Sequence, residues 1–156
     1  MPQTPLEPHN SSPRVFNRAG VRLEVAQDMI GAIISHFAEL IGQEREQGSP
    51  RQHRIAEAQR LISELKDVRE ELDSHQPASI EAAISWFAPF ARHLFANTSD
   101  NTEAHRRTAQ FDQANASLRL EGQAMSIDDL VVQARVADGL WTTEQAVSWY
   151  RERAKQ

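Results

Sequence analysis

The sequence contains no cysteine, which excludes disulfide bonds, thiolate zinc sites and a cysteine nucleophile. It also has no apolar run long enough to span a membrane, and its first residues lack the apolar segment of a secretory signal. We therefore expect a cytoplasmic protein. The formal net charge is −5, and acidic residues outnumber basic ones in both halves of the chain. DNA binding is disfavoured, because a DNA-binding protein typically carries a basic surface.

Sequence motifs of enzymes and metal sites are also absent. GxGxxG, GxxxxGK(S/T) and GxSxG do not occur, so nucleotide-binding folds and serine hydrolases are unsupported. No histidine forms a HExxH or ExxH pattern. The six histidines are His9, His36, His53, His75, His93 and His105. We expect no catalytic residues, no metal site and no cofactor.

What the chain does contain favours helices. The strand-forming residues Val, Thr and Tyr are sparse, whereas Ala, Glu, Gln, Arg and Leu are common. The length of 156 residues fits one domain or two small ones, and hydrophobic residues, at 40%, suffice for a modest core. The composition therefore predicts an all-α fold.

The first two thirds of the chain are expected to hold a helical bundle. Residues 1–17 contain four prolines and few apolar side chains, which predicts a disordered tail. Apolar residues then recur at three- and four-residue steps from residue 20 to residue 47, which predicts a long helix ending at Gly48. Two more helices complete a bundle of about three helices over residues 18–97.

Two local signals shape the second and third helices of this bundle. In Ser49-Pro50-Arg51-Gln52, the serine is the expected N-cap, the proline the first helical residue and the glutamine the partner in a capping box. Within the third helix, Pro89 lacks a backbone N–H group. We expect Pro89 to kink or split that helix.

A second unit is expected after the polar stretch 97–101, whose turn-forming residues mark a boundary. Residues 98–156 should form a small three-helix module, and its first helix is capped by Asp100 or Thr102.

The second and third helices of this module have clear starting signals. Ser126 opens the second, and the capping box from Thr142 to Gln145 opens the third. These two short helices are expected to form a hairpin that packs on Trp141 and Trp149.

The end of the module's first helix carries its most unusual feature. Ser117 and Glu121 lie one turn apart on one side of a helix, and Gly122 is the natural stop. A carboxylate is poorly placed at a helix C-terminus, because the partial negative charge there repels it. We expect the compensating charge to come from outside the helix, most simply from an arginine of a partner.

An apolar stripe runs along the same helix, and Ser117 and Glu121 flank it while Leu120 points away. Such a stripe fits a docking helix and equally an ordinary amphipathic helix. The residues of the stripe, which we take as candidate contacts to a partner, are Ala104, Phe111, Ala114 and Leu118.

The spacing Ser117-x-x-x-Glu121-Gly122 resembles the inhibitory motif Ser/Thr-x-x-x-Glu-Gly/Asn of the antitoxins that restrain Fic-domain AMP-transferases. The surrounding layout is similar to that of the small VbhA-type antitoxins, in which an inhibitory helix is followed by a helix, a glycine turn and a threonine-capped helix. Residues 114–122 and 137–146 carry this likeness, which extends over residues 102–154. The N-terminal 99 residues depart from the family and resemble none that we recognise.

The resemblance implies a mechanism. Glu121 would form a salt bridge with the second arginine of the Fic motif HxFx(D/E)GNGRxxR, which otherwise holds the γ-phosphate of ATP. Ser117 would be a supporting hydrogen-bonding partner near the phosphates, and Gly122 would end the helix. The chain has no such Fic motif of its own, so it would act in trans on a Fic-domain toxin, with no membrane involved.

The residues leave a second interpretation open. The chain would then be a helical accessory or transcriptional regulatory protein without a Fic partner, and Ser117 to Gly122 would be merely a helix end. The N-terminal bundle would in either case be free to wrap around a toxin, to dimerise or to read DNA, although its acidity weighs against DNA.

Overall fold

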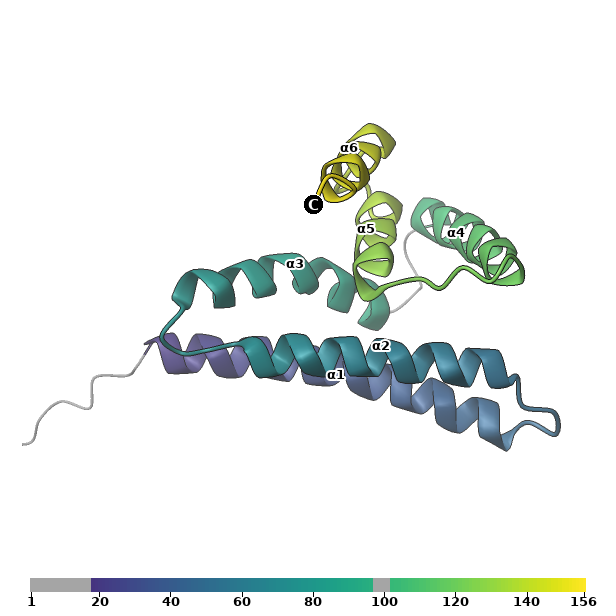
Figure 1. Cartoon of the computed structure of the whole chain (residues 1–156), viewed down its shortest axis with the longest axis horizontal. Helices are drawn as coiled ribbons and strands as arrows, with labels where there is room; N and C mark the ends of the chain where they lie inside the picture. Colours follow the sequence, from purple (N-terminus) through teal and green to yellow (C-terminus); the bar gives the residue numbers. More distant parts are fainter. Residues whose placement is uncertain (1–17, 97–101) are drawn as a thin grey trace, which may run out of the picture.

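The computed structural model describes residues 18–96 and 102–156, and within these ranges the chain forms six α-helices and no strand (Figure 1). The prediction of an all-α fold is confirmed. None of the described helices is long and apolar enough to cross a membrane. The helices are α1 (Arg18–Glu46), α2 (Gln52–Glu71), α3 (Pro77–Phe95), α4 (Thr102–Leu120), α5 (Ile127–Ala137) and α6 (Thr143–Arg153).

The predicted tail at residues 1–17 and the predicted cap Asp100 lie outside the described residues. Thr102, the alternative cap, is the first residue of α4.

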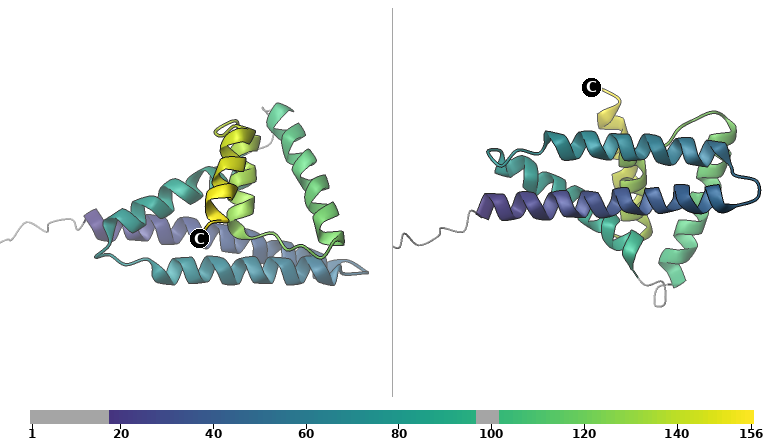
Figure 2. Two further views of the ribbon diagram at one scale, coloured as in Figure 1. Left: turned by 45° about the horizontal axis from the view of Figure 1, so that its top comes forward. Right: turned by 90° about the horizontal axis from the view of Figure 1, so that it is seen from below.

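The helices are built around the hairpin of α1 and α2. The third helix packs across α1, α5 packs on α3 and also reaches α2, and both α4 and α6 lie against α5 (Figure 2). One cluster of buried apolar side chains joins α1, α2, α3 and α5, with Ile30, Leu65, Ile80 and Val131 at its centre. This core thus includes residues on both sides of the predicted boundary at 97–101, and the division into two units stays a prediction.

The predicted start of the second helix is wrong. Its first helical residue is Gln52, and the N-cap is Arg51, which has extended backbone angles and no side-chain capping bond. Ser49 is therefore not the cap, and Pro50 is not the first helical residue. The cause is Glu44, a buried carboxylate near the end of α1, which accepts hydrogen bonds from Arg51 Nη2 at 2.5 Å and Nε at 3.1 Å. This pairing accompanies the extended conformation of Arg51, directly before α2 begins.

Glu44 is expected to make stability depend on pH. Its pKa lies below the usual 4.5, because Arg51 donates to the carboxylate, and Arg54 Nη1 adds a third bond at 3.0 Å. The stabilisation is present above the unfolded-state pKa and is lost as pH falls through the lower folded-state pKa. Glu44→Gln should lower the thermal midpoint by a few degrees at neutral pH, and the difference from the wild type should shrink as the pH is lowered into the acidic range, below the usual carboxyl pKa.

Thermal unfolding followed by circular dichroism checks this prediction. Glu46→Gln, which changes an exposed carboxylate in the same turn, is the control. A difference between Glu44→Gln and the wild type that stays constant across this pH range would contradict the prediction.

Pro89 does not split the third helix, which runs unbroken from Pro77 to Phe95 with Pro89 buried inside it. A proline leaves the carbonyl four residues earlier without its helical donor. That carbonyl belongs to Ser85, and it accepts a hydrogen bond of 2.7 Å from Nη2 of Arg135 on α5, which also donates to Trp86 O at 3.0 Å. Arg135 thus satisfies the broken part of α3 and ties α5 to it.

The predicted hairpin of the last two helices packs on an aromatic cluster. The capping box from Thr142 to Gln145 is formed as predicted, and Ser126 opens α5 as predicted, with a capping box of its own to Asp129. Trp149 stacks on Trp86 of α3 with ring centroids 5.5 Å apart, and Trp141 meets Trp86 edge-on at 6.0 Å. The two predicted tryptophans therefore fasten the hairpin to α3, and all three rings are half-buried.

Candidate functional site at the end of α4

The helix α4 ends as the sequence predicts. Gly122 has a φ of 77°, in the left-handed region that favours glycine. Its N–H donates to Arg119 O at 3.1 Å, and the N–H of Gln123 donates to Leu118 O at 3.0 Å. These two bonds form a Schellman motif, which satisfies the last helical carbonyls and places Glu121 at the C-cap.

The end of α4 presents an unpaired carboxylate to solvent. Glu121 is exposed, and its side chain forms no hydrogen bond or ion pair with any residue in the described part of the chain. Ser117 is also exposed, and its hydroxyl donates to Gln113 O at 3.3 Å. Leu120, between them in sequence, is 91% exposed. The fold thus offers a carboxylate, a hydroxyl and an apolar side chain without using any of them in its core.

The predicted contact stripe is only partly exposed to solvent. Ala104, Phe111 and Leu118 are half-buried, while Ala114 is exposed. The stripe turns toward α5, because Asn115, one turn from Phe111, is only 3% exposed and pairs with Gln133. The two amide groups exchange hydrogen bonds of 2.8 and 2.9 Å.

Sequence reasoning missed Asn115. Its position within the apolar stripe of α4 was the signal that could have identified it, since a buried amide in such a stripe requires a polar partner.

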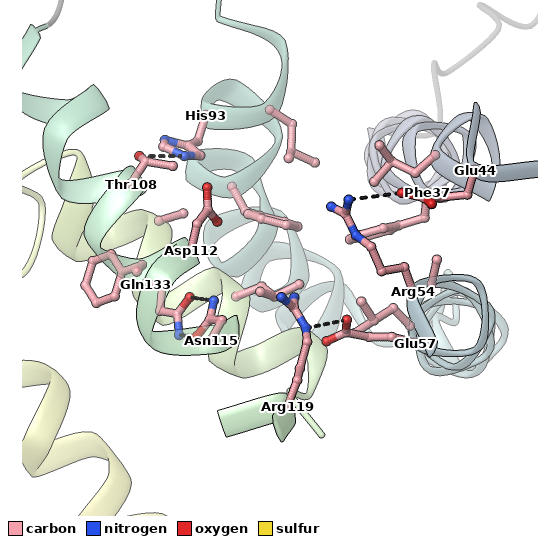
Figure 3. Close-up of a pocket in the computed structure, with 18 of the residues that line it drawn as sticks. Phe37, Glu44, Arg54, Glu57, His93, Thr108, Asp112, Asn115, Arg119 and Gln133 are labelled. Atoms are coloured by element: carbon pink, nitrogen blue, oxygen red, sulfur yellow. Dashed lines mark hydrogen bonds and ion pairs between the residues drawn. The ribbon is translucent and has the colours of Figure 1, made fainter. Parts of the chain in front are cut away.

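A cavity of about 450 Å³ separates α4 from the α1–α2 hairpin and α3 (Figure 3). Its walls combine aromatic rings with charged and amide groups, and α4 lies close to α5 alone among the described helices. The contacts across it are polar: Arg119 Nε donates to Glu57 at 2.7 Å, and Thr108 Oγ1 lies 3.5 Å from His93 Nε2. Nothing from α4 enters the apolar core, so polar groups set its distance from the bundle.

No group of three or more acidic or histidine side chains in the described ranges is arranged to hold a metal ion.

The left-handed conformation of Gly122 leads to a prediction about stability. Replacing it by alanine should lower the free energy of unfolding by about 1–2 kcal/mol, because an L-residue is strained at positive φ. The cost is conformational only, since no atom lies within 4 Å of the added Cβ. Gly31→Ala is the matched control, because Gly31 lies inside α1 and its added Cβ also meets nothing within 4 Å. That change should instead stabilise the protein by about 0.5–1 kcal/mol.

Chemical denaturation of the two glycine variants checks both the expected loss of stability in Gly122→Ala and the expected gain in Gly31→Ala. Equal stability of Gly122→Ala and the wild type would show that the left-handed turn is not needed to end α4.

Comparison with known proteins does not place the chain in a family. No family model matches it, and no curated protein or solved structure matches it.

Proposed function

We propose that the chain is an antitoxin that binds a Fic-domain AMP-transferase and blocks productive binding of ATP. The observation that supports this most is the state of Glu121, an exposed carboxylate at a helix C-cap without a partner in the described structure. It belongs to the spacing Ser117-x-x-x-Glu121-Gly122, which resembles the inhibitory motif of Fic antitoxins.

Electrostatics favour a cationic partner at this position. The C-terminus of a helix carries a partial negative charge, so a carboxylate there costs about 0.3–1 kcal/mol. An incoming guanidinium would be attracted both to Glu121 and to the end of α4. Arginine also binds a carboxylate through two parallel hydrogen bonds, which fixes the geometry of the pair. The second arginine of the Fic motif meets these requirements, and once paired it no longer holds the γ-phosphate of ATP.

The proposed inhibitory module comprises residues 98–156, with the three helices of residues 18–97 as its support. Phe111 and Leu118 are partly covered by the chain itself, so the contact to the toxin would use the exposed side of α4. That side presents Ala114 and Ser117, and Leu120 stands at its end. The complex would form in the cytoplasm, where ATP is available to the toxin.

Co-expression with a Fic protein encoded beside this chain tests the proposal. The chain should co-purify with that protein and suppress the transfer of labelled AMP from ATP to its target. Undiminished AMP transfer at saturating chain would overturn the proposal. Salt-sensitive binding to promoter DNA, with no Fic protein recovered, would instead identify a transcriptional regulator.

A further inference from the structure

Three polar side chains on one face of α2 bind the last turn of α4 and the segment that follows it. Glu57, Arg60 and Glu64 are spaced three and four residues apart, so they line up along the helix. Glu57 accepts a hydrogen bond of 2.7 Å from Arg119 Nε, in the last turn of α4 (Figure 3).

The other two side chains bind the far end of the same segment. Arg60 donates to the backbone carbonyl of Met125, and the backbone N–H of Ile127 donates to Glu64 Oε2 at 2.8 Å. Arg60 and Glu64 also form an ion pair with each other. These three side chains of α2 therefore hold the chain both before and after the turn that carries Glu121.

Between these two attachments the turn is open to solvent. Residues 120–124 are all exposed, whereas Met125 and Ile127 are buried. The side chains of Glu57 and Arg119 are 15% and 31% exposed, so solvent screens this pair less than it screens a fully exposed one. The two bonds to backbone groups involve a charged partner, which makes them stronger than neutral hydrogen bonds.

We propose that α2 acts as a clamp that positions Glu121 for its partner. Glu57, Arg60 and Glu64 are positioning residues, because they act on the turn and do not themselves reach the partner's arginine. A turn held at both ends loses less conformational freedom on binding, so a clamped carboxylate binds more tightly than a loose one. The inference rests on the proposed function, and it gives the N-terminal helices a role in inhibition.

Hydrogen exchange tests the clamp in the chain alone. The double variant Glu57→Gln with Glu64→Gln removes both negative charges of the clamp. The amides of Gly122 and Gln123 should then exchange about tenfold faster, because the bonds that close the turn open more often. Amides in the centre of α1 should be unchanged. Unaltered exchange at both turn amides would overturn the proposal.

A matched control removes two charges elsewhere on the same helix. Glu70→Gln with Glu71→Gln changes exposed carboxylates at the other end of α2, and it should leave the turn amides as in the wild type. If the first double variant fails to fold, the same exchange measurement is made on Glu57→Gln alone, because the bond between Glu64 and the N–H of Ile127 is then intact.

Inhibition of the Fic protein provides the second readout. The clamp variant should need about tenfold more protein for half-inhibition, and it should still inhibit fully at saturation. Glu121→Gly separates the two proposals. If Glu121→Gly inhibits like the wild type, the proposed function fails, whatever the exchange data show. If Glu121→Gly loses inhibition but the clamp variant keeps wild-type potency, the clamp fails alone.

Discussion

Under the proposed function, Glu121→Gly is expected to abolish inhibition of the Fic protein and to leave the fold intact. Removing one member of a buried charge pair typically costs about 2–5 kcal/mol, so a lost arginine contact amounts to about thirtyfold or more. With the arginine free, the γ-phosphate regains its place, and AMP transfer at saturating variant should return close to the rate without the chain. The complex should still form, because the other proposed contacts between α4 and the toxin are unchanged.

The fold should tolerate this change, because Glu121 is exposed and unpaired within the described residues. AMP transfer and co-purification, measured side by side, check the prediction. Glu121→Gln separates charge from shape and should also lose inhibition. Glu152→Gly, at the exposed end of α6, is the matched control and should inhibit like the wild type. Full inhibition by the Glu121→Gly protein would rule out the mechanism.

Local features of this fold could be predicted from the sequence. The capping boxes at Ser126 and Thr142 and the left-handed glycines Gly122 and Gly139 are formed by residues within a few positions of each other. Such signals depend on backbone geometry alone, so no tertiary information is needed to recognise them.

Features that depend on distant residues could not be predicted in this way. The guanidinium of Arg135 replaces the hydrogen bond that Pro89 removes from the carbonyl of Ser85. Arg135 and Ser85 are 50 residues apart in the sequence. The pairing of Asn115 with Gln133 likewise turns the stripe of α4 toward α5. Each contact requires the arrangement of α3, α4 and α5, which periodicity does not specify. A pattern of apolar residues shows which face is buried but not what covers it.

Val131→Asp is expected to unfold the whole chain and not only its C-terminal part. Val131 lies on α5, is 0% exposed, and belongs to the apolar cluster shared with α1, α2 and α3. A buried carboxylate without a partner costs more than about 4 kcal/mol, which is a large part of a total stability of about 5–15 kcal/mol. Helical circular dichroism and the fluorescence of the tryptophan cluster should therefore be lost together.

The control for this prediction is Val147→Asp on α6, where the side chain is 40% exposed and the new charge can remain in water. Its thermal midpoint should stay close to that of the wild type. The comparison also tests how the chain is divided. If Val131→Asp disrupts the tryptophan cluster while the helices of residues 18–96 still melt as in the wild type, the two parts fold independently. A single, simultaneous loss of both signals would mean that α5 completes the core of the first three helices, and that the turn at Glu121 is carried by one cooperative unit.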